Sequence, residues 1–439
     1  MERARWGSEG PTAARRPGRR ADGAEGQAEF AQWADSALAA RGGDVRAFNR
    51  RVLLRLIERG GPISRADLAR RAGLTMPSVS EIVDELLGSG LVAWGGEGKS
   101  TGGRRPALLR FNPSRGSVLA ADLGSTRAIV GLFLLDGTLV SETSFVLPAN
   151  ARGDDVVDRL ATSAQELLAA SPPDCPPVLA MGVAAPGVTN PETGEVSLAP
   201  AVGWAGTPVR HMLEQRLGVA VVVDNDVNAA ALAEWRFGQG AQYRSFVFVS
   251  IGTGVGMGVL LDGLIHRGRL HQAGEIGYMV VEPVESSRAG RDARQFGNLE
   301  ARLSLPALAR DYSALWSGTV SSRLLGPEED PEPVLSRLFE DFAAGDRMAV
   351  AFLQERASLL ARALLNVYVV LAPDAIFLGG PVSPYVPLLQ PLIEAELEQL
   401  SPFRPLLVAS ALQRAGLVGA CALASDLAKE SLMRPEGAQ

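Results

Sequence analysis

A single carboxylate stands in an otherwise uncharged stretch of ten residues, QAGEIGYMVV, at positions 272 to 281. Glu275 lies between Gly274 and Gly277, and the phenol of Tyr278 follows three positions later. A carboxylate in such surroundings either accepts hydrogen bonds from nearby backbone amides or is kept for a ligand. The residues alone do not decide whether Glu275 binds backbone amides or a ligand.

Three glycine-rich turns, AADLGST, SIGTGVGMG and IFLGGP, each follow a predicted strand. Stacked backbone N–H groups in such turns can hold phosphate oxygens. Each turn alone is weak evidence, because glycine often follows a strand. In this order the turns resemble the phosphate and adenosine loops of the actin-like sugar kinase superfamily. The resemblance marks as nucleotide-loop residues Asp122, Gly124, Thr126, Gly252, Thr253 and Gly254.

A small N-terminal module is predicted to be a winged helix-turn-helix spanning residues 44 to 116. Helical periodicity runs to Gly60-Gly61-Pro62, a second short helix follows Ser64, and a third begins at Thr75, a good N-cap. A hairpin with a glycine-rich, basic tip is predicted within residues 91 to 112.

In this type of module the third helix presents its first turns to the major groove of DNA. Short polar side chains there can reach base edges, and arginines on the second helix and the wing can hold phosphates or enter a minor groove. The predicted DNA-contacting residues are Arg65, Arg70, Arg71, Thr75, Met76, Ser78, Ser80, Arg104 and Arg105. A protein-binding module with a solvated basic face is the alternative, and the basic charge and polar turn residues favour DNA.

Beyond Gly116 the chain alternates predicted strands and helices, which indicates an α/β body of two lobes over residues 117 to 439. Strands are predicted at 118–122, 128–135, 139–146, 178–185, 219–223, 246–251, 257–261 and 375–378. Helices are predicted at 156–170, from Asn228 onward, at 346–371 and at 417–430.

The charge is divided unequally between these parts. Residues 44 to 115 hold 13 Lys and Arg against 7 Asp and Glu, whereas residues 117 to 439 hold 23 against 36. A basic module on an acidic body points to a separate partner for each. Residues 1 to 43 are nearly neutral and rich in Gly, Ala and Arg, so we expect a disordered tail, with a tail that grips DNA as the alternative.

Two cysteines and three histidines occur in 439 residues. No disulfide framework is implied, and a cytoplasmic, nucleoid-associated location fits. A structural zinc built from Cys and His is close to excluded. The apolar stretches are too short to span a membrane, and no signal-peptide core follows the Arg-rich N-terminus.

Four further motifs follow in order: VAAPGVTNPETGEV, VVVDNDVNAAALAEW, AGEIGY and GNLE. With the glycine-rich turns they make residues 44 to about 430 resemble the ROK family of repressors, uncharacterised reading frames and sugar kinases. The module with its STGGRRP wing resembles the repressor branch, because the family kinases lack a DNA-binding domain. The resemblance implies a two-lobed, actin-like body related to ribonuclease H.

The resemblance also implies roles for individual residues. In family kinases the aspartate at the position of Asp226 takes a proton from the sugar hydroxyl. Asn225, Glu275 and Glu300 match residues that hydrogen-bond sugar hydroxyls. Tyr278 stands where members commonly have a histidine that touches sugar and binds zinc. These five residues are the expected sugar site.

Several positions depart from the family pattern. The segment EPVESSRAGRDARQFGNLE lacks the family's zinc cysteines, with Asn298 at one cysteine position, so no zinc is expected. Ala201 replaces an asparagine that contacts sugar, which together with Tyr278 indicates an altered or weakened ligand preference. Ser125 and Met257 interrupt the nucleotide loops and can crowd a phosphate, so ATP is not an expected cofactor.

The sequence therefore predicts a transcriptional regulator, most simply a repressor, that binds palindromic operator DNA as a homodimer or homotetramer. A sugar or sugar derivative between the lobes would modulate its DNA affinity. Two alternatives stay open. One is an active ATP-dependent sugar kinase with an attached DNA-binding domain, because Asp122 and Asp226 remain. The other is a ligand-independent repressor whose sugar pocket has decayed.

Overall fold

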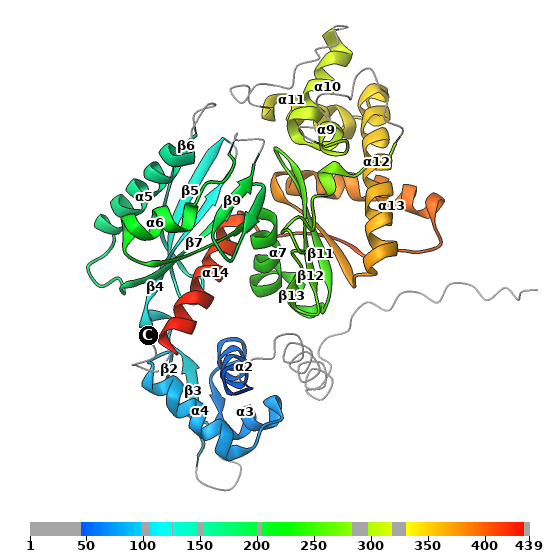
Figure 1. Cartoon of the computed structure of the whole chain (residues 1–439). Coiled ribbons are helices and arrows are strands. Elements are labelled where there is room, and N and C mark those ends of the chain that lie inside the picture. Colours follow the sequence, from blue (N-terminus) through cyan, green and yellow to red (C-terminus); the bar gives the residue numbers. More distant parts are fainter. Residues whose placement is uncertain are drawn as a thin grey trace, which may run out of the picture.

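The computed structural model describes residues 45–98, 105–124, 126–147, 153–199, 204–282, 297–317 and 331–433. A winged-helix module is followed by two lobes, each built on a five-stranded sheet (Figure 1). Within the described ranges, no helix is long and apolar enough to cross a membrane. The predicted tail at 1–43 and the predicted site residue Arg104 lie outside the described residues, as do Ser125 and Ala201.

The module has the predicted arrangement of three helices and a hairpin. Ser64 caps the second helix by accepting a hydrogen bond from Asp67 N at 3.1 Å, and Thr75 caps the third. Gly73, with a φ of 64°, makes the left-handed turn between these helices. The elements are α2 (Val45–Gly60), β1 (Ile63–Ser64), α3 (Arg65–Ala72), α4 (Met76–Gly88), β2 (Val92–Glu97) and β3 (Ala107–Phe111).

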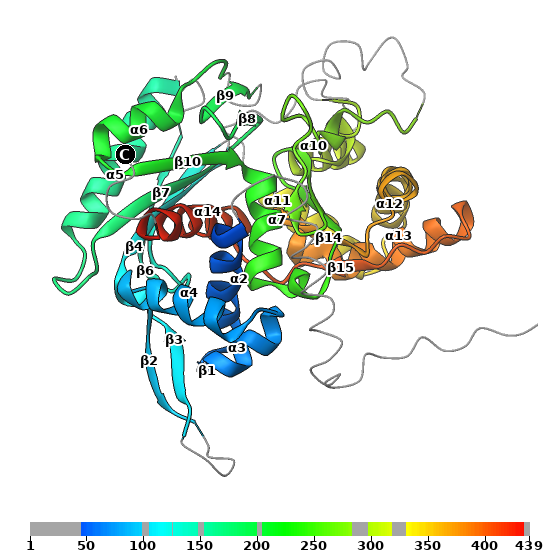
Figure 2. The ribbon, with the colours of Figure 1, turned by 60° about the horizontal axis from the view of Figure 1, so that its bottom comes forward.

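The first lobe carries a sheet in the order β10-β7-β4-β5-β6. The strands are β4 (Ser117–Leu123), β5 (Arg127–Leu134), β6 (Leu139–Val146), β7 (Val178–Ala185) and β10 (Ala220–Asn225). Helices α5 (Gly153–Ala169) and α6 (Val209–Leu217) cover one face, and α14 (Ala415–Leu432) covers the other (Figure 2). A small ribbon of β8 (Val188–Asn190) and β9 (Glu195–Leu198) follows β7.

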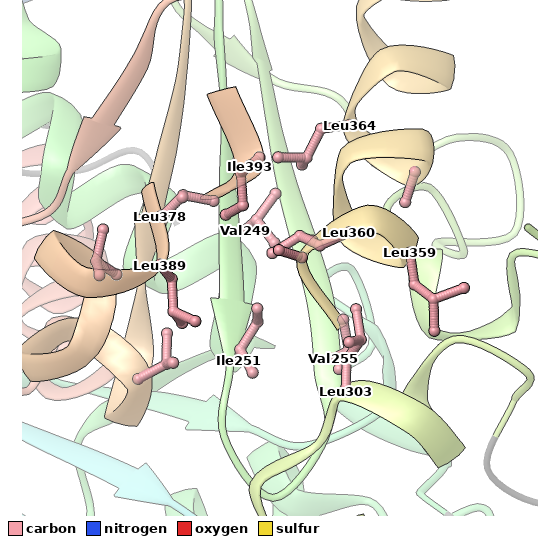
Figure 3. Packing of buried hydrophobic residues seen from close by; sticks show 14 of the residues in the cluster. Val249, Ile251, Val255, Leu303, Leu359, Leu360, Leu364, Leu378, Leu389 and Ile393 are labelled. Carbon is pink, nitrogen blue, oxygen red and sulfur yellow. The ribbon is translucent and has the colours of Figure 1, made fainter. Parts of the chain in front are cut away.

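The second lobe carries a sheet in the order β13-β12-β11-β14-β15. The strands are β11 (Phe246–Ile251), β12 (Val255–Leu261), β13 (Leu264–Ile265), β14 (Ala375–Gly379) and β15 (Leu407–Ala409). One face packs on α12 (Arg347–Leu371) and α13 (Val386–Leu400), where side chains such as Val249, Leu360 and Ile393 meet (Figure 3). Beside them lie α9 (Glu300–Leu303), α10 (Leu305–Ser317) and α11 (Glu332–Ala343).

Two helices, α7 (Asp226–Phe237) and α14, join the lobes along their shared side (Figures 1 and 2). Glycines bring them to backbone contact: a Cβ on Gly419 of α14 would lie 1.9 Å from the carbonyl oxygen of Ala229 in α7. A Cβ on Gly182 of β7 would lie 2.0 Å from the carbonyl oxygen of Ala420. Helix α14 is therefore clamped between β7 and α7.

The predicted fold class is confirmed, and every predicted strand and helix is present with differences only at its ends. One start was wrong: α7 begins at Asp226 rather than at Asn228, because Asn225 already serves as its N-cap. The elements that were not predicted are the short strands β1, β8, β9, β13 and β15 and the helices α6, α9, α10, α11 and α13.

Candidate functional site

Four half-buried carboxyl groups lie close enough to interact electrostatically where the lobes meet. Burial raises the pKa of Asp122 to about 6. Burial, followed by the charges of Asp122 and Glu275, raises the pKa of Asp226 to about 7. Burial, opposed by the amide of Val255, raises the pKa of Glu300 to about 7. Four carboxyl groups gathered in this way suit a ligand with several hydroxyl donors.

Asp226 is held at the start of α7 by Asn225. Asn225 Oδ1 accepts hydrogen bonds from the amides of Val227 and Asn228 at 2.9 and 3.0 Å. Its Nδ2 donates to the carbonyl of Gly187 and to Asp226 Oδ1, both at 3.0 Å. The side chain predicted to bind sugar thus also positions Asp226, whose Oδ2 has no hydrogen bond to any described residue.

Glu275 does not cap its own turn. It precedes the 3₁₀ turn η4 (Ile276–Tyr278), and its side chain makes no hydrogen bond there or to any other described residue. Gly274, with a φ of 96°, lets the chain approach β12, where a Cβ would lie 1.8 Å from the carbonyl oxygen of Met257. Within the described part of the chain, the local-capping interpretation of Glu275 is therefore wrong.

Glu300 joins this turn to the predicted nucleotide loop. Its Oε2 accepts a hydrogen bond from the amide of Val255 at 2.9 Å, and a Cβ on Gly254 would lie 2.8 Å from the same oxygen. Tyr278 is 44% exposed beside these carboxylates, and burial together with the charges of Glu300 and Glu275 raises the pKa of its phenol. Tyr278 therefore stands at the rim of the carboxylate cluster.

The other predicted nucleotide-loop residues lie in two turns at the strand ends. Gly252, Thr253 and Gly254 form the turn from β11 to β12, where the amide of Gly252 donates to the carbonyl of Gly254 at 2.9 Å. Asp122 is the last residue but one of β4 and lies next to Gly416 of α14, where a Cβ would lie 2.7 Å from the carboxylate. Gly124 and exposed Thr126 follow Asp122.

One expectation about these loops was wrong. Met257 does not crowd a phosphate, because it lies within β12 and its side chain is buried in the core of the second lobe. Met257 lies on the same face of β12 as Val255 and Val259, and all three pack into that core.

The described residues do not fit the zinc that the family pattern implies. Among them no group of three His, Cys, Asp or Glu is placed to hold a metal ion, and residues 283–296 lie outside the described ranges. The segment from Gly297 is fixed by backbone contact instead: Leu299 N donates to the carbonyl of Gly277 at 2.9 Å. Gly297, with a φ of 82°, permits this approach.

The raised pKa values predict how stability depends on pH. Because the pKa of Asp226 rises from 3.8 unfolded to about 7 folded, the folded chain binds more protons between these values. The associated stability is present below about pH 4 and is lost as the pH rises through about 7. We expect Asp226→Asn to stabilise the protein by about 1–2 kcal/mol at pH 8 and by little at pH 4. Melting curves of both proteins across this range test it, and a difference that does not vary with pH would contradict it.

The predicted DNA-contacting residues other than Arg104, which lies outside the described ranges, are on or beside α3 and α4 and on the wing. On α4, Met76 is 46% exposed, Ser78 and Ser80 are half-buried, and Val79 is fully buried as expected. The Oγ atoms of Thr75 and Ser78 are 3.0 Å apart. The first turn of α4 therefore keeps a polar outer face.

The arginines of the module are mostly paired within it. Arg65 donates to Asp84 at 2.6 Å, Arg70 to Asp67 at 2.5 Å, and Arg105 lies 3.6 Å from Glu97. Arg71 is exposed near Gly60. Such surface pairs are weak, so phosphate can replace the carboxylate partners at low cost.

With this geometry in hand, the class of the protein is clear from comparison with known families. The ROK family model matches residues 118–427, and a MarR family model matches residues 49–93 of the module. The chain belongs to the ROK family.

Individual relatives come from both branches of the family. The chain is 28% identical to the xylose repressor of Caldicellulosiruptor bescii over 77% of this chain and 84% of that one. It is 27% identical to the transcriptional dual regulator NagC of Escherichia coli over 86% and 92%. A solved ROK family regulator, described as a homolog of E. coli MLC, has the same fold with a TM-score of 0.72, 23% identity and coverage of 93% and 98%. A ROK family glucokinase from Streptomyces griseus has a TM-score of 0.59 and 26% identity, covering 71% of this chain and all of its own.

Proposed function

We propose that the protein is a DNA-binding transcriptional regulator, most simply a repressor, whose operator affinity is modulated by a sugar or sugar derivative. The observation that carries this proposal is Glu275, a half-buried carboxylate among three others with no hydrogen bond to a described residue. It sits in a chain that also carries a winged-helix module. Relatives named as a xylose repressor and as NagC support the regulatory role.

The proposed ligand site comprises Asn225, Asp226, Glu275, Tyr278 and Glu300. Asp226 lies on α7 and Glu275 on a turn of the second lobe, so a sugar bound to both would bias how the lobes close. A ligand shifts such an equilibrium only by its difference in affinity for the two arrangements. Because α7 continues toward the module, a change at Asp226 has a direct path to α2.

The remaining partners are proposals of the same kind. The predicted DNA-contacting residues would bind a palindromic operator from a homodimer or homotetramer, with half-sites about 34 Å or a multiple apart. We place the protein in the cytoplasm with its DNA. Neither zinc nor ATP is needed in this proposal, because residues 279 to 300 contain no cysteine or histidine and sensing requires no phosphate transfer.

The proposal is tested by melting the purified protein against a panel of neutral sugars and amino sugars, each with and without Mg-ATP. We expect one sugar to raise the melting temperature without ATP. Glu275→Ala should weaken its binding about tenfold, the effect of losing one hydrogen bond to a charged group. Glu398→Ala, an exposed carboxylate on α13, is the matched control and should leave binding unchanged. No response to any sugar would support the decayed pocket instead.

An active sugar kinase is the second candidate, and the placement of Asp226 favours it. A carboxylate with a pKa near 7 and one oxygen without a described partner has the properties of a general base. Sugar-dependent ATP hydrolysis that disappears in Asp226→Asn would establish this candidate, whereas a melting response indifferent to ATP argues for sensing alone.

A further inference from the structure

A cavity of about 230 Å³ lies between the winged-helix module and the body, away from the carboxylate cluster. Its walls come from α2, the end of β3, the β5–β6 turn, the end of α7 and α14. Figures 1 and 2 show α2 beside α7 and α14, with the wing extending away from the body. The cations in the wall are Arg55 and Arg59 from α2, Arg236 from α7 and Lys429 from α14.

The carboxylates near the cavity already form ion pairs or hydrogen bonds with other residues of the chain. Arg236 pairs with Asp426, and Lys429 pairs with Glu58 at 2.6 Å. Asp136, the other acidic residue of the wall, is exposed, and its Oδ1 accepts a hydrogen bond from Thr138 N at 3.0 Å. Arg59 makes no ion pair with any described carboxylate. The four cations of the wall thus face three described carboxylates, Glu58, Asp136 and Asp426, which leaves an excess of one positive charge.

Three of these guanidinium groups surround one aromatic ring. Arg55, Arg59 and Arg236 lie 5.1, 5.7 and 5.5 Å from the centre of the Trp235 ring. A ring attracts each cation by about 0.5–2 kcal/mol but cannot neutralise it. Burial, and then the charge of Arg236, lowers the pKa of Arg55 to about 10, although the charges of Asp426 and Glu58 act in the opposite direction. Like charges are thus held together at a site that an anion would relieve.

We propose that this cavity binds a small molecule carrying a phosphate monoester group or inorganic phosphate. The planar fork of arginine matches phosphate oxygens in pairs, and several arginines converge here. The volume is below the usual range of about 300–1,000 Å³ for larger ligands, which favours a small metabolite. DNA is a poor fit, because the cavity lies between the module and the body, away from α4 and the wing.

A phosphate in this cavity would connect α2 to both α7 and α14. It would fix the module against the body and so change the freedom of two modules in an oligomer to meet DNA half-sites. This second ligand site is separate from the proposed sugar site, and its occupation does not depend on Glu275.

The experiment uses the full chain and three probes at constant ionic strength: inorganic phosphate, glycerol 3-phosphate and glycerol. We expect a saturable rise in melting temperature with at least one phosphate compound and none with glycerol. Arg59→Gln, an exposed residue whose change should not affect folding, is expected to weaken binding about tenfold. Arg55→Gln, which changes a less exposed arginine of the same wall, should also weaken phosphate binding about tenfold.

Two controls decide the outcome. Arg51→Gln removes an exposed cation of the same helix that pairs with Glu430 outside the cavity wall, and it should leave phosphate binding unchanged. Glu275→Gln should also leave it unchanged, which keeps this test independent of the sugar proposal. The absence of a saturable shift, an equal shift in Arg59→Gln, or a shift lost in Glu275→Gln overturns the inference.

Discussion

Exchanging Ser78 for glutamate is expected to weaken operator binding about 100-fold while leaving the melting temperature unchanged or slightly raised. Ser78 is the third residue of α4 after the N-cap Thr75, the position at which a glutamate completes a capping box and favours the helix dipole. The substitution should therefore favour the folded state, whereas it places a carboxylate instead of a hydroxyl against the DNA. A lost base contact of about 1–3 kcal/mol together with charge repulsion accounts for the size of the effect.

The measurement is fluorescence anisotropy with DNA selected from a random pool by the wild-type protein. Ser78→Gln is the matched control, because glutamine has nearly the same size and also fits a capping box, but it carries no charge. We expect Ser78→Gln to lose about tenfold, and the gap between the two variants measures the charge effect. Wild-type affinity in Ser78→Glu would show that α4 does not face the groove.

Replacing Gly419 by alanine is expected to lower the free energy of unfolding by about 2–3 kcal/mol, although alanine is the better helix former. The added Cβ would lie 1.9 Å from the carbonyl oxygen of Ala229, which belongs to the interior of α7 and cannot rotate away. Helix α14 cannot move away from α7 either, because β7 is in contact with its other side. A Cβ on Gly182 of β7 would lie only 2.0 Å from the carbonyl oxygen of Ala420.

Gly88→Ala is the matched control for this prediction. It is the same substitution in a helix, α4, but no atom lies within 4 Å of the new Cβ. We expect a gain of about 0.5–1 kcal/mol there from helix propensity alone. Urea unfolding of both variants gives the comparison, and equal stability of the two would show that α14 is not in backbone contact with α7.

Local signals explain which parts of the fold could be predicted. Ser64 and Thr75 cap helices through their own side chains, and the central strands β4, β7, β11 and β14 are mostly apolar runs. Helix α13 was missed because prolines at its start and inside it conceal the helical pattern. Strand β15 has only three residues and exists because it pairs with β14, about thirty residues earlier in the chain. No local pattern records such a pairing.

The carboxylates of the candidate sugar site were predicted through the family resemblance, and the structure brings them together. The engagement of Asn225 with α7 and the burial of Met257 depend on three-dimensional packing and could not be read from spacing. The junction cavity was missed entirely, because Arg55 and Lys429 stand at opposite ends of the chain. A tryptophan followed by arginine, Trp235-Arg236, was the one visible signal, and alone it predicts nothing.

The clamped position of α14 also sets an order of events during synthesis. The winged-helix module is made well before α14, yet it rests on that helix, and the buried core of the module continues into the face of β4 and β7 that α14 covers. At ordinary rates of translation about 15 to 60 s pass between the two. During that interval a nascent chain carries its DNA-binding surface without the helix that joins the module to the lobes, so a ligand between the lobes can influence the module only after α14 has been made.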